Sequence, residues 1–148
     1  METHFDPGIE KINILRQDIS RVLLNLFNNA FYSVNEKMKK TLSASPGDER
    51  TENSREEYKP VVRVMTKSIR LSPGHAGVLI SIWDNGMGIP QEVLNKIFEP
   101  FFTTKPTGQG TGLGLSLSYD IITKGHRGEL KVNTKEGEYA EFIIELPL

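Results

Sequence analysis

The amino-acid sequence predicts one α/β sandwich, with a mixed and mostly antiparallel sheet of about five strands packed against about three helices. A long segment near the N-terminus carries apolar residues at helical spacing, and several later segments alternate like strands. A stretch with a glycine at every second position then leads into another helical pattern. The 148 residues, 37% hydrophobic and 25% charged, are ordinary for a globular protein, and we expect residues 1–148 to form a single domain.

The first expected elements are an edge strand and a long helix. Lys11–Leu15 alternates apolar and polar residues, which predicts the strand. Asp18 or Ser20 can cap the helix, which we expect to reach Lys39 or Lys40. Its buried face is expected to consist of Ile19, Val22, Leu23, Leu26, Phe27, Ala30 and Val34.

The rest of the chain is expected to alternate between loops, strands and two shorter helices. Residues 41–60 bury too little apolar surface to offset the entropy of ordering, which predicts a mobile loop. Helices are expected near Gln91–Ile97 and from the end of the glycine stretch to Thr123. Ser72-Pro73-Gly74 and Thr134-Lys135-Glu136-Gly137 are expected to link two pairs of strands. The four strands are Val61–Ile69, Val78–Trp83, Glu129–Asn133 and Ala140–Leu146.

Charge and composition exclude several functions. A net charge of -1 without a run of lysine and arginine gives no footprint for nucleic acid or an anionic membrane, so we expect neither as a partner. No apolar run reaches the roughly 20 residues that cross a bilayer, and the first residues lack a signal-peptide pattern. The absence of cysteine excludes disulfides and thiolate chemistry. We expect a monomeric, cytoplasmic domain, whose parent protein could still be anchored in a membrane.

Asparagines interrupt the apolar pattern of the long helix. Asn25 and Asn29 are one turn apart on the same helical face, within joint reach of a ligand. A side-chain amide oxygen is a hard, neutral ligand suited to Mg²⁺. The same residues could instead face water or fix a hydrogen bond in the core.

A second chemical signal, Asp84-Asn85-Gly86-Met87-Gly88, follows a strand directly. Asn-Gly would suit a hairpin turn, but the next residues do not return as a strand. An aspartate beside two glycines can accept a hydrogen bond from an exocyclic amine while a flat ring approaches the backbone. Adenine carries such an amine, whereas guanine presents a keto oxygen at that position.

The third signal combines an aromatic segment with the glycine stretch. Residues 98–105 hold three phenylalanines, which can anchor a loop on the core, and end in Lys105, which could place a cation near a terminal phosphate. The stretch Gly108–Gly114 fits neither a Walker loop nor a Rossmann fingerprint, and alone it could be a turn or linker. Its position before a helix would let the helix N-terminus favour phosphate.

In their order along the chain, these pieces resemble the four boxes of the ATP-binding domain of sensor histidine kinases. They read Asn-Leu-Phe-Asn-Asn-Ala, Asp-Asn-Gly-Met-Gly, Phe-Glu-Pro-Phe-Phe-Thr-Thr-Lys and Gly-Gln-Gly-Thr-Gly-Leu-Gly. That domain belongs to the superfamily shared with gyrase, the MutL mismatch-repair ATPases and the large heat-shock ATPase chaperones. Its nucleotide pocket is called the Bergerat fold. The resemblance implies ATP and Mg²⁺ as ligands and a flexible lid over residues 89–110.

The resemblance also implies a role for each matched residue. Asn29 would hold Mg²⁺ with Asn25 beside it, Asp84 would take the adenine amine, and Lys105 would help to neutralise the phosphoryl group. Hydrolytic members carry a glutamate where this chain has Asn25, and an amide cannot act as a general base, so Asn25 and Lys105 are the expected catalytic residues of a transfer reaction. The expected nucleotide-binding residues are Asn29, Tyr32, Asp84, Gly86, Gly88, Ile89, Phe98, Lys105, Gly108, Gly110, Thr111, Gly112, Leu113 and Gly114.

The function implied by the resemblance is transfer of the ATP γ-phosphoryl group to a histidine. His4, His75 and His126 lack the setting of a phosphoacceptor, so the acceptor is expected on a separate dimerisation domain of the same or a partner kinase, with a response regulator downstream. Two alternatives remain open: a serine kinase of the anti-sigma-factor type, and an ATP-sensing interaction module without transfer.

Two positions depart from the pattern of the family. Tyr32 stands where many relatives carry a basic residue, which leaves one phosphate contact open. Arg127 stands where relatives commonly have glycine. If this position requires a positive φ, arginine would cost on the order of 1 kcal/mol.

Overall fold

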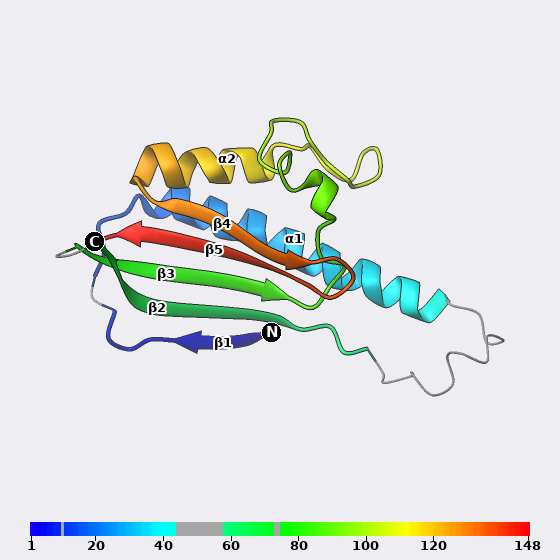
Figure 1. Cartoon of the computed structure of the whole chain (residues 1–148), viewed down its shortest axis with the longest axis horizontal. Helices are drawn as coiled ribbons and strands as arrows, with labels where there is room; N and C mark the ends of the chain where they lie inside the picture. The colour runs from blue at the N-terminus through cyan, green and yellow to red at the C-terminus, as the bar shows by residue number, and fades with distance from the viewer. Residues whose placement is uncertain (10, 44–57, 73–74) are drawn as a thin grey trace.

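The computed structural model describes residues 1–9, 11–43, 58–72 and 75–148. In these residues, five strands form one mixed sheet, and the helices α1 and α2 lie on one side of it (Figure 1). The expected α/β sandwich with a five-stranded sheet is therefore confirmed, with two helices rather than about three.

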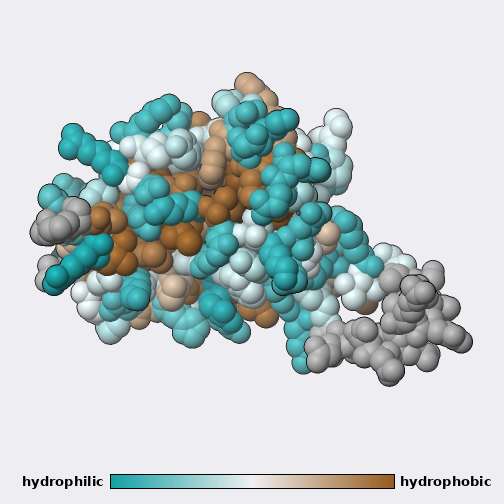
Figure 2. Space-filling model, viewed as in Figure 1, coloured by the Kyte–Doolittle hydropathy of each residue, from teal (hydrophilic) through white to brown (hydrophobic). Residues whose placement is uncertain are grey.

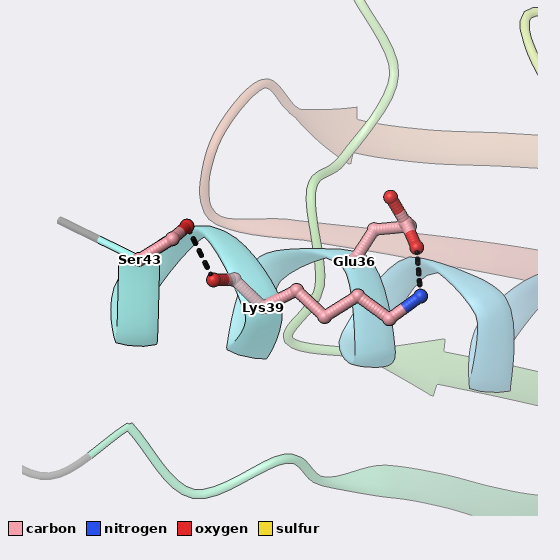
Figure 3. Close-up of polar contacts among 3 residues, drawn as sticks. All are labelled: Glu36, Lys39 and Ser43. Carbon is pink, nitrogen blue, oxygen red and sulfur yellow. Dashed lines mark hydrogen bonds and ion pairs between the residues drawn. The ribbon is translucent and has the colours of Figure 1, made fainter.

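Helix α1, Arg16–Ser43, is the longest element and supplies most of the helical side of the core. Its buried residues recur at three-and-four spacing, as expected: Ile19, Val22, Leu26, Ala30 and Val34. The helix continues beyond Lys40, so the expected loop does not begin at residue 41. The Ser43 hydroxyl donates to the Lys39 carbonyl at 2.7 Å, and the Lys39 ammonium reaches back to Glu36 at 2.8 Å (Figure 3). Residues 44–57 of the expected mobile loop lie outside the described residues.

The strands are arranged in the order β1-β2-β3-β5-β4. Strand β1 pairs parallel with β2, and the other neighbours are antiparallel. The hairpin expected between the last two strands is confirmed, whereas Pro73 and Gly74 of the other expected turn lie outside the described residues. The strands are β1 (Glu2–Phe5), β2 (Val62–Ser72), β3 (His75–Asp84), β4 (Glu129–Lys135) and β5 (Tyr139–Pro147).

The expected edge strand at Lys11–Leu15 is wrong. These residues form no regular element; Ile12 and Ile14 pack against the core, which explains the apolar alternation without strand pairing. The parallel edge strand is instead Glu2–Phe5, whose residues are all exposed. Because neither face of this strand is buried, its sequence carries no alternating signal.

The helix expected at Gln91–Ile97 is also wrong. Only a single 3₁₀ turn, η1 (Gln91–Val93), forms there, and the chain then continues in turns to Pro100. A segment bracketed by Pro90 and Pro100 is too short for a stable helix of its own. The helix after the glycine stretch is confirmed as α2 (Gly114–Asp120), extended by a π-helical turn, η2 (Ile121–Gly125).

The core lies between α1, the α2–η2 segment and the inner face of the sheet. Its most deeply buried large side chains include Leu26, Ile82, Ile122, Ile144 and Leu146. In the space-filling view from the same side, hydrophobic residues gather near the middle of the face, with hydrophilic residues around them (Figure 2). Within the described residues, neither helix combines the length and apolar character that a membrane span requires.

Candidate functional site

A cavity of about 550 Å³ opens between α1, the loop after β3 and residues 102–115. It brings together residues that are far apart in the sequence. Most of the expected site residues line it: Asn25, Asn29, Tyr32, Asp84, Gly88, Ile89, Lys105, Gly110, Thr111, Gly112 and Gly114. Four of the expected nucleotide-binding residues are not among the lining residues: Gly86, Phe98, Gly108 and Leu113.

One part of the cavity, named the Asp84 end below, is lined by Asp84, which is only 3% exposed. The Gly86 backbone N–H donates to Asp84 Oδ1 at 2.9 Å. Burial raises the pKa of Asp84 to about 6, while the hydrogen bonds from Gly86 and Ser33 and the positive charge of Lys37 oppose this rise. The end of β3 thus presents a buried carboxyl group that is held in one orientation.

The glycines after Asp84 are required by lack of space. A Cβ on Gly86 would collide with Ser33 Oγ and lie 2.6 Å from Asp84 Oδ1. Gly88 has a φ of +64°, and a Cβ there would collide with the carbonyl oxygen of Lys135. The loop therefore requires a glycine at position 86, although Gly86 does not line the cavity.

Backbone hydrogen bonds fix the same loop on both sides. The Met87 N–H donates to Ser33 Oγ on α1 at 2.9 Å, and the Ile89 N–H donates to Thr134 Oγ1 on β4 at 2.9 Å. The Met87 carbonyl accepts from the Gly137 N–H at 2.7 Å. Sequence patterns missed these contacts because they join residues at least 45 positions apart.

Asn25 connects α1 to the start of α2. Its amide nitrogen donates to the Gly114 carbonyl at 3.1 Å and to Ser118 Oγ at 3.2 Å. Ser118 is fully buried and itself donates to the Gly114 carbonyl at 2.8 Å. Asn25, which we expected beside the reacting phosphate, thus holds the start of α2 against α1. Its amide offers no titratable group to the cavity.

A second part of the cavity, named the Lys105 end below, is lined by Lys105, whose side chain reaches α1. Its ammonium donates to Asn29 Oδ1 at 3.0 Å and lies 4.5 Å from the centre of the Tyr32 ring. Partial burial lowers the pKa of Lys105. Three of the expected nucleotide-binding residues therefore form one cluster, and Tyr32 serves as a π surface for a cation that comes from another segment.

The four alternating glycines have different structural reasons. Gly112 has a φ of +67°, and a Cβ on it would lie 2.5 Å from the Phe101 carbonyl oxygen. A Cβ on Gly110 would lie 2.7 Å from Thr103 Oγ1, whereas Gly108, at φ +85°, has open space around it. At Gly114 a Cβ would make only an ordinary contact, 3.6 Å from Asn25 Cγ. Only the middle of the stretch is packed tightly against residues 101–105.

Two of the expected residues outside the cavity lining support it from the side. Phe98 packs on the core, with its ring 5.0 Å from that of Tyr119 in α2. Leu113 immediately precedes α2 and accepts the Leu117 N–H at 3.0 Å. Both residues hold the segments around the cavity without facing it.

Some lining residues were not expected from the sequence. Among them are Ser33 and Glu36, which lie on the same side of α1 as Asn25 and Asn29. Glu36 is paired with Lys39, as Figure 3 shows, and its side chain is 30% exposed. The four-residue spacing of Asn25, Asn29 and Ser33 could have revealed Ser33 from the sequence.

The arginine that departs from the family pattern does adopt a left-handed conformation. Arg127 has a φ of 53° and lies between η2 and β4. The neighbouring His126 accepts the Leu15 N–H at Nε2, at 3.2 Å, and its Nδ1 lies 3.0 Å from the Ile121 carbonyl oxygen. His126 thus joins the start of α1 to the end of η2.

Comparison with known proteins identifies the family of this chain. The sequence profile of the histidine kinase-, DNA gyrase B- and HSP90-like ATPases matches residues 15–148. The chain belongs to this family. It is a catalytic ATPase domain of the sensor histidine kinase type, and membership implies that it binds ATP.

Curated relatives agree with this assignment. The signal transduction histidine-protein kinase AtoS of Escherichia coli K12 is 34% identical over 146 residues, which make up 99% of this chain and 19% of AtoS. The sensor kinase CckA of Brucella abortus is 51% identical over 70 residues, which make up 47% of this chain and 7% of CckA. The chain thus spans only a small part of either kinase.

Solved structures confirm the fold. The catalytic domain of histidine kinase ThkA, in a nucleotide-free form, matches with a TM-score of 0.69 at 28% identity, covering 98% of this chain and 77% of that one. The mycobacterial sensor histidine kinase MprB matches with a TM-score of 0.58 at 26% identity, covering 99% of this chain and 79% of that one.

Proposed function

We propose that this domain transfers the γ-phosphoryl group of ATP to a histidine on a separate dimerisation domain of the same or a partner kinase. The observation that carries the proposal is the single cavity lined by Asp84, Asn29 and Lys105, with the amide of Asn25 beside them. The cavity has room for a nucleotide, and its two ends carry different chemistry. Residues 89–110 act as the lid over it.

The Asp84 end recognises the base. Its carboxylate accepts a hydrogen bond from the exocyclic amine of adenine, and Gly88 and Ile89 of the following loop also line the cavity. A guanine would place its keto oxygen toward the carboxylate and leave both acceptors unpaired. The buried setting of Asp84 makes this discrimination stronger than it would be in water.

The residues at the other end fit Mg²⁺. Asn29 Oδ1 faces the cavity and accepts a hydrogen bond from the Lys105 ammonium, so it can hold a positive charge. No group of three or more His, Cys, Asp or Glu suited to a metal occurs in the described residues, which agrees with an ion held largely by phosphates and water. Asn29 would hold the ion, and the ion would neutralise negative charge on the phosphates.

The transfer step requires positioning and charge neutralisation. The acceptor imidazole nitrogen attacks the γ-phosphorus, the new N–P bond forms as the bond to the bridging oxygen breaks, and ADP leaves with that oxygen. Lys105 supplies positive charge, and Asn25 holds the start of α2 in place. Because Asn25 cannot take a proton from water, the site favours transfer over hydrolysis.

The proposed partners follow from this chemistry. His126 of this chain has both ring nitrogens engaged with the backbone, which makes it unsuited as the acceptor, and we place the acceptor on a dimerisation domain. A response regulator then receives the phosphoryl group. The domain works in the cytoplasm, where ATP and Mg²⁺ are supplied.

The test is to mix the purified domain with a histidine-containing dimerisation hairpin and γ-labelled ATP. Acid-labile phosphate on the hairpin is the expected result, and its loss in Asp84→Asn is the specific control. Lys131→Met, on the outer side of β4, is the matched control that should retain transfer. Tight ATP binding without acid-labile phosphate would overturn the proposal, and acid-stable phosphate on a small protein partner would identify a serine kinase.

A further inference from the structure

Lys105 contacts the side-chain oxygen of Asn29, the atom that the proposed function assigns to the metal ion. Its ammonium is 3.0 Å from Asn29 Oδ1 and 4.5 Å from the centre of the Tyr32 ring. We propose that Lys105 is a placeholder for the metal: it holds Asn29 Oδ1 in the free domain and leaves it when Mg²⁺ and nucleotide bind. This inference rests on the proposed function, because it takes Asn29 as the metal ligand.

The arrangement of the two segments supports a placeholder. Asn29 and Tyr32 lie one turn apart on α1, whereas Lys105 belongs to the lid. The Lys105 ammonium and a metal ion would both bind Asn29 Oδ1, and two cations at one oxygen repel each other. Binding of one therefore displaces the other.

The partners of Lys105 allow it to leave. The two carboxylates that line the cavity are engaged elsewhere, Asp84 with the Gly86 N–H and Glu36 with Lys39. Lys105 makes no ion pair within the described ranges, and its contacts are to a neutral amide and an aromatic face. Such contacts bind a cation less tightly than a carboxylate does, so incoming phosphates can compete for it.

The same contact couples the metal to the position of the lid. The Lys105 backbone N–H donates to Thr103 Oγ1 at 3.1 Å, and the aliphatic part of its side chain lies beside Gly110. Moving the Lys105 side chain therefore affects residues 103–110, which cover one end of the cavity. Binding of the metal and rearrangement of the lid are then linked in free energy.

The first test measures ATP affinity by calorimetry, with Mg²⁺ and with EDTA, in the wild type and in Lys105→Met. The ratio of the two dissociation constants is the gain from metal. This gain should rise about fivefold in Lys105→Met, the effect of one net hydrogen bond, because the metal no longer has to displace a cation. Lys96→Met removes another lysine of the same lid, exposed and outside the cavity lining, and should leave the gain unchanged.

An equal gain in wild type and Lys105→Met would overturn the placeholder, because it would mean that the metal does not compete with Lys105 for Asn29. This failure is distinct from failure of the proposed function. If the gain changes as expected but the dimerisation hairpin receives no phosphate, the placeholder stands and the kinase proposal falls.

The second test needs no nucleotide. An amine-reactive reagent is applied to the free domain, and labelling of each lysine is followed by mass spectrometry, with exposed Lys40 and Lys67 as internal references. Asn29→Ala should speed labelling of Lys105 about fivefold and leave both references unchanged. If Asn29→Ala leaves the Lys105 rate unchanged, the contact does not hold the lysine in solution and the inference is wrong.

Discussion

The two ends of the cavity are built in different ways. At the Asp84 end, Gly86 and Gly88 leave no room for a Cβ, and hydrogen bonds tie the loop to both α1 and the β4–β5 hairpin. At the Lys105 end, one hydrogen bond and one cation–π contact join the Lys105 side chain to α1. The loop at Asp84 is therefore held by the scaffold on two sides, whereas the segment of Lys105, which we propose as part of the lid, could rearrange with the loss of fewer polar contacts.

The largest expected effect is on the free energy of unfolding. It tests whether the loop at Asp84 is constrained by lack of space or by backbone conformation alone. Gly88→Ala should lower the free energy of unfolding by about 3–4 kcal/mol, because it combines a positive φ with a collision against the Lys135 carbonyl. Gly108→Ala also has a positive φ, but nothing lies within 4 Å of its Cβ, and it should cost only about 1 kcal/mol. Urea unfolding measures both. Equal losses would mean that the base end is no more constrained than the lid.

Replacing the buried carboxylate of Asp84 should weaken ATP binding and at the same time stabilise the fold. Asp84→Asn should weaken ATP binding about a hundredfold, since an amide donor can face the adenine amine. It should also raise the free energy of unfolding at pH 7, because the pKa of Asp84 is raised to about 6 and the fold disfavours its charge. The rise from 3.8 to about 6 corresponds to at most about 3 kcal/mol. Calorimetry and urea unfolding test this, with the exposed Asp120→Asn as control; a less stable Asp84→Asn would contradict it.

The pH dependence of stability is expected to have an unusual sign for a carboxyl group. Between the unfolded value of 3.8 and the folded value of about 6, the folded state binds more protons at Asp84 than the unfolded state. The wild type should therefore lose stability relative to Asp84→Asn as pH rises from 4 through 6, by about 1.4 kcal/mol per pH unit at most.

ATP affinity should instead rise with pH over this range, because protonation of Asp84 below pH 6 removes the negative charge that accepts the hydrogen bond from adenine. Parallel stability profiles for wild type and Asp84→Asn would show that the pKa of Asp84 is not raised. Unfolding curves at pH 4, 5, 6 and 7 provide the measurement.

The smallest effect is expected where the glycine stretch meets α2. Gly114→Ala should change stability by less than about 0.5 kcal/mol, because a Cβ there lies 3.6 Å from Asn25 and the residue begins a helix. Gly112→Ala, two residues earlier, should be strongly destabilising. A large loss in Gly114→Ala, measured by urea unfolding, would show that the whole stretch is constrained and would remove the difference between the two ends.

The sequence predicted the elements whose burial is periodic. Helix α1 and strands β2 to β5 each place apolar residues on one face, and all were found with shifted ends. Strand β1 was missed because it is exposed throughout, and Ile12 and Ile14 suggested a strand because they pack on the core. A strand that is exposed on both faces leaves no distinct pattern in a single sequence. Nor does an apolar segment that packs on the core without pairing with a strand.

The candidate site was predicted through its chemistry but not through its supports. Asp84, Asn29 and Lys105 were expected together, and they do line one cavity. The hydroxyl of Ser33 and the turn at Gly137 were not expected, because their partners lie 54 and 50 positions away along the chain. Contacts of this range depend on how strands and helices are packed, which no local motif records.

The turn between β4 and β5 has a consequence for how this chain can change in length. Surface hairpin turns usually accept insertions readily. Here the Lys135 carbonyl lies against Gly88, and the Gly137 N–H donates to the Met87 carbonyl at 2.7 Å. An extra residue in this turn would shift Met87 and Gly88, which line the cavity, although residues 135–137 do not line it themselves. A loop that looks free to vary is thus constrained in length by the loop that it supports.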